Sequence, residues 1–190
     1  MAEHTFTLLV ENADLLAEEN LDALFEIGCD DATFGERGSV SYADFDREAP
    51  SFAEAVISGI QEIESAVAGA RVVRVEPEEF VSLSSIAKRT GRSRESIRLL
   101  AEGRRGPGGF PTPERWVDAR TTVWHWAEVA EWFENRLGEH VARADEAHVV
   151  AAINGLLEAR RHAAQAPEPI RRAVASFAHA TPELRELLTA

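Results

Sequence analysis

The chain has 190 residues, 45% of them hydrophobic, a net charge of −13 and an isoelectric point near 4.9. This length fits two small domains plus a tail, and the acidic balance argues against a typical nucleic-acid-binding protein. The single cysteine excludes an intramolecular disulfide, and no stretch reaches the roughly 18 apolar residues of a membrane span. We therefore expect a soluble, cytoplasmic protein.

The charge is unevenly distributed along the chain. Residues 1–81 carry 19 Asp and Glu against 4 Arg, which gives −15. Residues 84–126 carry 9 Lys and Arg against 4 Asp and Glu, which gives +5. A strongly acidic unit therefore precedes a small basic one, and the charge of the whole chain conceals the basic segment.

The first third of the chain alternates between strand and helix patterns. Strands are predicted over residues 4–10, 32–36, 38–45 and 71–75, and helices from Asn12 or Asp14 to Ile27 and over residues 51–68. The apolar side of the first helix is expected to hold Leu15, Leu16, Leu21, Leu24, Phe25 and Ile27. This α+β order, βαββαβ, predicts an acidic ferredoxin-like domain over residues 1–79, a fold that by itself names no function.

Leu83–Ala101 has the spacing of a helix-turn-helix. The small Ala87 lets the two helices cross closely, and Gly91 can take the positive φ of a tight turn. Ser93 is the expected N-cap of the second helix, with Glu95 in the first turn, where the helix dipole favours an anion. The expected apolar contacts come from Ile86, Ile97 and Leu100.

Two Gly- and Pro-rich turns follow. A β-hairpin is then predicted around residues 118–120, with Trp116-Val117 and Thr122–Trp124 as its two strands. A helix is predicted over residues 127–137, and its inward-facing side chains are expected to be Val129, Trp132, Phe133 and Leu137. Helix-turn-helix, hairpin and helix together predict a winged helix-turn-helix domain over residues 80–137. Residues 138–190 are predicted to form an α-helical C-terminal region with helices at 145–164, 170–179 and 182–188, of which the first carries a candidate dimer surface.

Residues about 80–137 resemble the winged helix-turn-helix of the MerR/excisionase superfamily, especially short regulators of the AlpA and BldC kind. The segments that carry this resemblance are SLSSIAKRTGRSRESIRLL, GGFPTP and VWHWAEVAEWF. In that family an aromatic-proline pair opens the wing, here Phe110-Pro111, and an aromatic-rich helix closes the module. The resemblance implies DNA binding by this part of the chain. It implies nothing about the N-terminal and C-terminal parts.

The residues themselves also indicate DNA recognition. The first turns of the second helix enter the major groove, where Arg94 or Arg98 can pair with guanine and Glu95 can accept a hydrogen bond from cytosine or stabilise its own helix. The other Lys and Arg side chains of this segment are expected to contact DNA phosphates. At the hairpin tip the negative charge of Asp118 opposes such a contact. The full expected DNA-binding set is Lys88, Arg89, Arg92, Ser93, Arg94, Glu95, Ser96, Arg98, Arg104, Arg105, Arg115 and Arg120.

Other candidate sites are weaker. Asp44, Asp46 and Glu48 share a strand face, which is more typical of a solvated acidic surface than of a metal site. Cys29 is expected to be a packed thiol, and the tryptophans are expected in the core. No nucleophile and base occur in a catalytic spacing, and no histidine falls in a zinc-ligand spacing. We expect no enzyme activity, no catalytic residue, no metal and no cofactor.

The sequence leaves several functions open. The first hypothesis is a sequence-specific transcriptional regulator that binds double-stranded DNA as a dimer and carries an N-terminal ligand- or partner-binding domain. The alternative is an antitoxin, whose acidic N-terminal or helical C-terminal part neutralises a toxin while the winged module represses the shared operon. A third hypothesis is an excisionase-like accessory factor.

Overall fold

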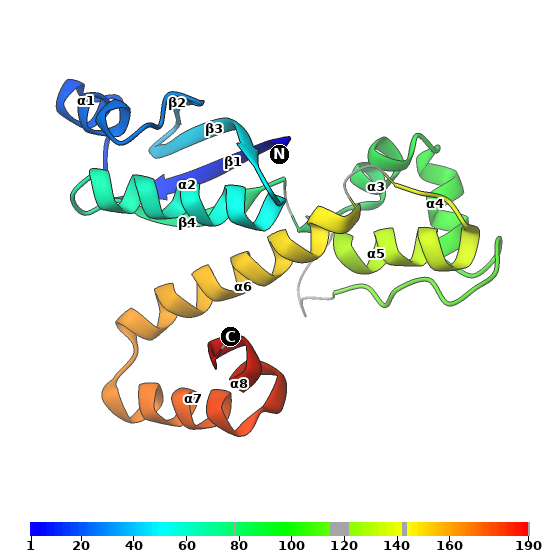
Figure 1. Ribbon diagram of the computed structural model, residues 1–190. Helices are drawn as coiled ribbons and strands as arrows, with labels where there is room; N and C mark the ends of the chain where they lie inside the picture. Colours follow the sequence, from blue (N-terminus) through cyan, green and yellow to red (C-terminus); the bar gives the residue numbers. More distant parts are fainter. Residues whose placement is uncertain (78, 115–121, 142–143, 190) are drawn as a thin grey trace.

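A four-stranded antiparallel sheet organises the first part of the chain (Figure 1). The computed structural model describes residues 1–77, 79–114, 122–141 and 144–189. Strands β1 (Ala2–Glu11), β2 (Ala32–Arg37), β3 (Val40–Ala49) and β4 (Arg71–Glu76) lie in the order β2-β3-β1-β4. Helix α1 (Glu18–Glu26) follows β1 and helix α2 (Phe52–Ala66) follows β3, so the predicted βαββαβ order is confirmed.

Alternation along the strands decides which face of the sheet is buried. On β1 the side chains of Phe6, Leu8 and Val10 are buried, and their neighbours are more exposed. On β3 every second residue from Ser41 to Ala49 is buried. Ser51 is the N-cap of helix α2, and its hydroxyl accepts from the Glu54 N–H. The helix packs its apolar side on this face.

The first helix is shorter than predicted. Asn12 takes a left-handed φ of 64°, and the Asp14 carboxylate accepts a hydrogen bond from the Leu16 N–H, so both candidate caps are used in a turn. Helix α1 therefore begins only at Glu18. The expected apolar side is wrong in part, because Leu16, Phe25 and Ile27 are exposed while Leu15 and Leu24 are buried.

The middle of the chain folds around a second core. It consists of strand β5 (Phe80–Val81), helices α3 (Leu83–Thr90) and α4 (Arg94–Ala101), strand β6 (Trp124–His125), helix α5 (Trp126–Trp132) and the π-helical turn η1 (Phe133–Leu137). Gly91 ends α3 with φ 67°, and Ser93 caps α4 by accepting from the Ser96 N–H, as predicted. The expected core members are also confirmed: Ile86, Ala87, Ile97, Leu100, Val129, Trp132 and Phe133 are buried, and Leu137 packs against them.

The predicted hairpin lies mostly outside the described residues, because 115–121 are not among them. Its two flanks are described. Glu114 and Val123 form an antiparallel bridge in which the Glu114 N–H donates to the Val123 carbonyl at 2.8 Å. The next residues, Trp124 and His125, pair with Phe80 and Val81. The two segments that flank the predicted hairpin therefore run antiparallel to each other, and the second of them continues into β6, which pairs with β5.

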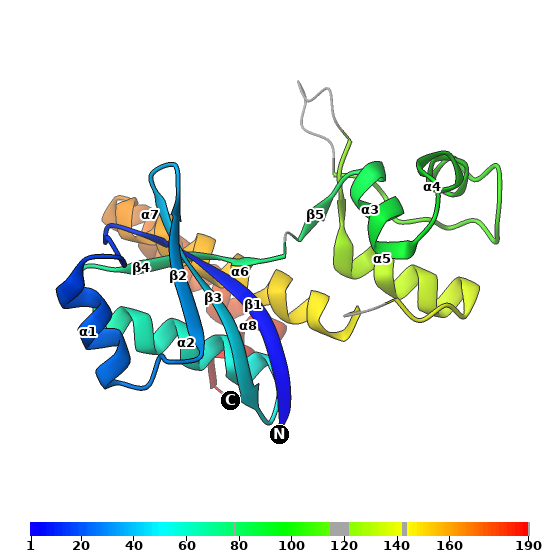
Figure 2. The ribbon, with the colours of Figure 1, turned by 90° about the horizontal axis from the view of Figure 1, so that it is seen from above.

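Helix α6 (Ala144–Gln165) takes part in both cores. Ala144 and Ala147 pack into the second core, whereas Val150 and Leu157 belong to the core beneath the sheet. Figure 2 shows the helix passing between the sheet and α5. The apolar stripe predicted as a dimer surface is thus largely used within the chain, and only Leu156 remains half-exposed. Helices α7 (Glu168–Ala180) and α8 (Pro182–Thr189) complete the chain.

Polar contacts from α6 and α2 cap the free edge of β4. The Asn154 amide lies against Val75, where its oxygen accepts from the N–H at 2.8 Å and its nitrogen donates to the carbonyl at 3.0 Å. At Val72 the Glu64 carboxylate accepts from the N–H, and the Arg160 guanidinium donates to the carbonyl. These contacts satisfy an edge that would otherwise be free to pair with another strand. No helix among the described residues is long and apolar enough to cross a membrane.

We predict that Asn154→Ala destabilises the protein by about 2–4 kcal/mol, because the substitution leaves two buried backbone groups at Val75 without partners. The matched control is Gly155→Ala in the same helix, where an added Cβ meets nothing within 4 Å. It should stabilise the protein by up to about 1 kcal/mol. Urea unfolding followed by circular dichroism measures both, and an Asn154→Ala protein as stable as wild type would contradict the edge-capping role.

Candidate nucleic-acid interface

Helix α4 presents a polar face opposite its buried side. Ile97 and Leu100 point into the core, whereas Arg94 and Glu95, at the start of the helix, are exposed. The Arg94 side chain has no hydrogen bond, ion pair or ring contact with the described residues, and its charge makes a small contribution to the lowered pKa of Glu95. A helix whose N-terminal turn is exposed and carries a free guanidinium is suited to enter the major groove and donate two hydrogen bonds to one guanine.

Arg98, the other predicted base-reading residue, is held on its own helix. Its guanidinium donates to Glu95 at 2.9 and 2.6 Å and to Glu102 at 2.5 Å. The Arg98 hydrogen bonds lower the pKa of Glu95 below its usual range, so that carboxylate stays ionised. Such exposed pairs contribute little to stability, because water screens them. A guanine or a phosphate can therefore replace them at little cost.

The predicted phosphate contacts fall into two groups. Lys88, next to the turn, and Arg105, after α4, are exposed, and their side chains have no hydrogen bond or ion pair with the described part of the chain. Arg104 is also exposed and forms an ion pair with Glu102 at 3.2 Å. Ser93 and Ser96 are joined in the N-cap hydrogen bond, so Ser93 acts first as a capping residue. Lys88 and Arg105, whose side chains have no partner among the described residues, therefore flank Arg94 in the sequence.

Arg89 and Arg92 have structural contacts. The Arg89 guanidinium lies 4.9 Å from the Trp126 ring centroid, and the Arg92 guanidinium lies 5.6 Å from that of Phe133 and also pairs with Glu139. These contacts join α3 and the turn after it to α5 and η1. Arg115 and Arg120 of the predicted set lie outside the described residues.

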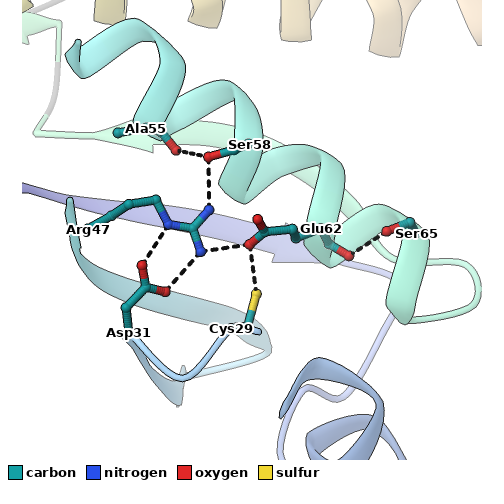
Figure 3. A network of polar contacts seen from close by, with 7 residues as sticks. All are labelled: Cys29, Asp31, Arg47, Ala55, Ser58, Glu62 and Ser65. Atoms are coloured by element: carbon teal, nitrogen blue, oxygen red, sulfur yellow. Dashed lines mark hydrogen bonds and ion pairs between the residues drawn. The ribbon is translucent and has the colours of Figure 1, made fainter. Parts of the chain in front are cut away.

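A buried ionic network that the sequence analysis missed lies in the sheet domain (Figure 3). Arg47 is only 6% exposed and donates to both oxygens of Asp31, at 2.7 and 2.8 Å, and to Glu62 at 2.6 Å. It also donates to the Ser58 hydroxyl at 2.9 Å. The hydrogen bonds to Asp31 raise the pKa of Arg47 above its ordinary range. The sequence did contain a signal for this residue, because Arg47 continues the alternation of buried and exposed positions along β3.

Cys29 lies at the end of this network and is fully buried. Its thiol donates to the Glu62 carboxylate at 3.2 Å. Burial, with a smaller contribution from that hydrogen bond, raises the pKa of the Cys29 thiol to about 12. Since the thiolate is the reactive form, the expectation of a packed thiol is confirmed. The network joins β3 and the loop that precedes β2 to helix α2. The Arg47 guanidinium, its one cation, is already paired with two carboxylates.

We predict that native Cys29 resists alkylation by iodoacetamide at mildly alkaline pH, because almost none of it is ionised well below its pKa of about 12. Since the chain has no other cysteine, mass spectrometry gives an unambiguous result. Unfolding in urea should restore labelling at the rate of a free thiol. Equal rates in the native and unfolded protein would contradict the buried, hydrogen-bonded thiol.

The remaining sequence candidates are placed by the fold. Trp124, Trp126 and Trp132 are buried in the second core, as expected. Asp44 and Asp46 lie on the face of the sheet opposite the core and accept hydrogen bonds from Thr7 and Thr5. Within residues 1–77, 79–114, 122–141 and 144–189, no group of three or more His, Cys, Asp or Glu could hold a metal ion.

A pocket of about 230 Å³ lies between the sheet and α6. Leu9, Val40 and Val73 supply apolar lining, and the polar lining includes Arg74, Glu79, Arg161 and His162. One carboxylate oxygen of Glu79 is inaccessible to water and has no hydrogen-bond donor among the described residues. The Glu79 carbonyl accepts from the Trp126 N–H at 2.7 Å, so this residue touches both the pocket and the second core.

Comparisons with protein-family models, with curated proteins and with solved structures find no match to this chain.

Proposed function

We propose that this protein is a sequence-specific DNA-binding transcriptional regulator whose middle segment is a winged helix-turn-helix. The observation that supports this most is the exposed start of α4, where Arg94 lies beside a capped N-terminus, with Lys88 and Arg105 close by in the sequence. None of these three side chains has a hydrogen bond or an ion pair with the described residues. This segment is net basic in a chain of −13. A net basic segment of this kind inside an acidic protein favours a nucleic-acid target there.

In this proposal base reading and phosphate binding are divided between residues. Arg94 reads a guanine, and Arg98 leaves its exposed pairs with Glu95 and Glu102 to contact a second base or a phosphate. Glu95, kept ionised, accepts from a cytosine amino group. Lys88 and Arg105 neutralise phosphates and set the register of the module on the duplex.

The sheet domain is the regulatory part of the proposal. Its βαββαβ order and β2-β3-β1-β4 arrangement support a ferredoxin-like domain. The pocket between the sheet and α6 supports ligand binding, because apolar lining is combined there with guanidinium and carboxylate groups. A ligand in this pocket acts on the DNA-binding segment through two connections. One is the hydrogen bond from the Trp126 N–H to the Glu79 carbonyl, and the other is helix α6, which packs into both cores.

We predict that Arg94→Ala weakens binding to a duplex from the upstream region of its own gene by about 1–3 kcal/mol, because a bidentate base contact is lost. Arg37→Ala, which removes an exposed guanidinium from the sheet domain, is the matched control and should bind like wild type. Fluorescence anisotropy at fixed salt, with an unrelated duplex as reference, measures both. The proposal fails if wild type does not prefer its own upstream DNA, or if the two variants behave alike.

A further inference from the structure

Strand β4 contains a β-bulge beside the pocket that lies between the sheet and α6. Leu9 of β1 pairs with Arg74, but the next residue of β1 pairs with Val72, so Val73 is an extra residue in β4. Val72 and Val75 are both buried although they lie three positions apart instead of two. The two consecutive side chains between them, Val73 and Arg74, both line the pocket. The bulge therefore brings an apolar side chain and a guanidinium to the same site, as bulges beside binding sites do.

The apolar part of the pocket is a small wall built from three strands. It consists of Leu9, Val40 and Val73, all of them half-buried. The volume of about 230 Å³ is smaller than the roughly 300–1,000 Å³ of a typical pocket for a drug-sized ligand. The space therefore suits one small molecule with a short aliphatic part, and not a nucleotide or a peptide.

Most polar groups around the pocket already have partners. The Arg161 guanidinium lies 3.2 Å from the Glu11 carboxylate, and the His162 ring lies 3.9 Å from that of Glu158. The Asn154 amide is used at the edge of β4. These groups have little left to offer a ligand.

Two lining groups of opposite charge are left over. The side chains of Arg74 and Glu79 have no hydrogen bond or ion pair, with each other or with any other residue that the structure describes. One Glu79 oxygen is also inaccessible to water, and an anion that has lost part of its hydration gains more from a cation than a fully hydrated one does. Arg74 can donate two parallel hydrogen bonds to a carboxylate.

We propose that this pocket binds a small zwitterion with an aliphatic side chain, which is the chemistry of a neutral aliphatic amino acid. Its carboxylate accepts from Arg74, its ammonium group pairs with Glu79, and its side chain packs on the apolar wall. A simple carboxylic acid leaves Glu79 unpaired, and a simple amine leaves Arg74 unpaired. A dicarboxylate or a phosphate brings a second negative charge towards Glu79. The inference rests on the ligand-binding role of this pocket in the proposed function and names the class of ligand.

Isothermal titration calorimetry on the full chain without DNA tests the inference, with L-leucine as the probe. Two truncated probes are matched to it: isocaproate lacks the ammonium group, and isoamylamine lacks the carboxylate. Leucine should bind, and each truncated probe should bind at least about tenfold more weakly, because a hydrogen bond between charged groups is lost. No binding of leucine, or equal affinity for a truncated probe, would overturn the proposal.

Substitutions at the two charged groups test which end of the ligand each one holds. Glu79→Gln and Arg74→Gln should each weaken leucine binding by at least about tenfold. Their effects on the truncated probes, followed by nuclear magnetic resonance titration, should be crossed. Glu79→Gln should not weaken isocaproate binding, and Arg74→Gln should not weaken isoamylamine binding. A general loss of structure would weaken both probes alike, and that result contradicts the assignment.

The matched control is Glu158→Gln, which neutralises a carboxylate that lines the same pocket but already lies beside His162. It should bind leucine within about twofold of wild type, because the pair is exposed and weak. Equal losses in Glu158→Gln and Glu79→Gln would show that the pocket responds only to its total charge, which contradicts the proposal. Because these measurements contain no DNA, amino-acid binding and DNA binding can fail independently.

Discussion

The structure depends on the packing of one helix, α6, against the edge of β4. Asn154 replaces the hydrogen bonds that a fifth strand would make to Val75, and Arg160 with Glu64 does the same at Val72. The first turns of α6 meanwhile belong to the other hydrophobic core. A 22-residue helix is stiff over this distance, so the two cores are held by one element rather than by a linker alone.

This arrangement places the pocket against the helix that takes part in both cores. The pocket is formed by the sheet on one side and by α6 on the other, so anything bound there contacts the helix that reaches the second core. Glu79 adds a shorter route, since its side chain lines the pocket and its carbonyl holds the first residue of α5. A ligand that binds better to one position of α6 would therefore act on the second core as well, which is the physical requirement for coupling between the two cores.

The sequence predicted local features better than long-range polar contacts. Gly91, Ser93 and the buried Ile97 follow from turn, capping and helical periodicity, and all three are confirmed. The early start of the first helix was wrong because Asp14 serves equally well in a turn, and only tertiary context decides between the two. Asn154 and Arg47 could not be paired with their partners, because those contacts span 79 and 16 residues.

The same limit applies to the exposed residues of α4. The sequence identified Arg98 as a base-reading residue, but it did not show that two neighbouring carboxylates hold its guanidinium. Nuclear magnetic resonance of the isotope-labelled full chain, titrated with its own upstream duplex, tests the central claim most directly. Amide shifts should change at Lys88 and over residues 93–98, with residues 2–49 little affected. Shifts confined to the sheet, or absent altogether, would contradict DNA recognition by α4.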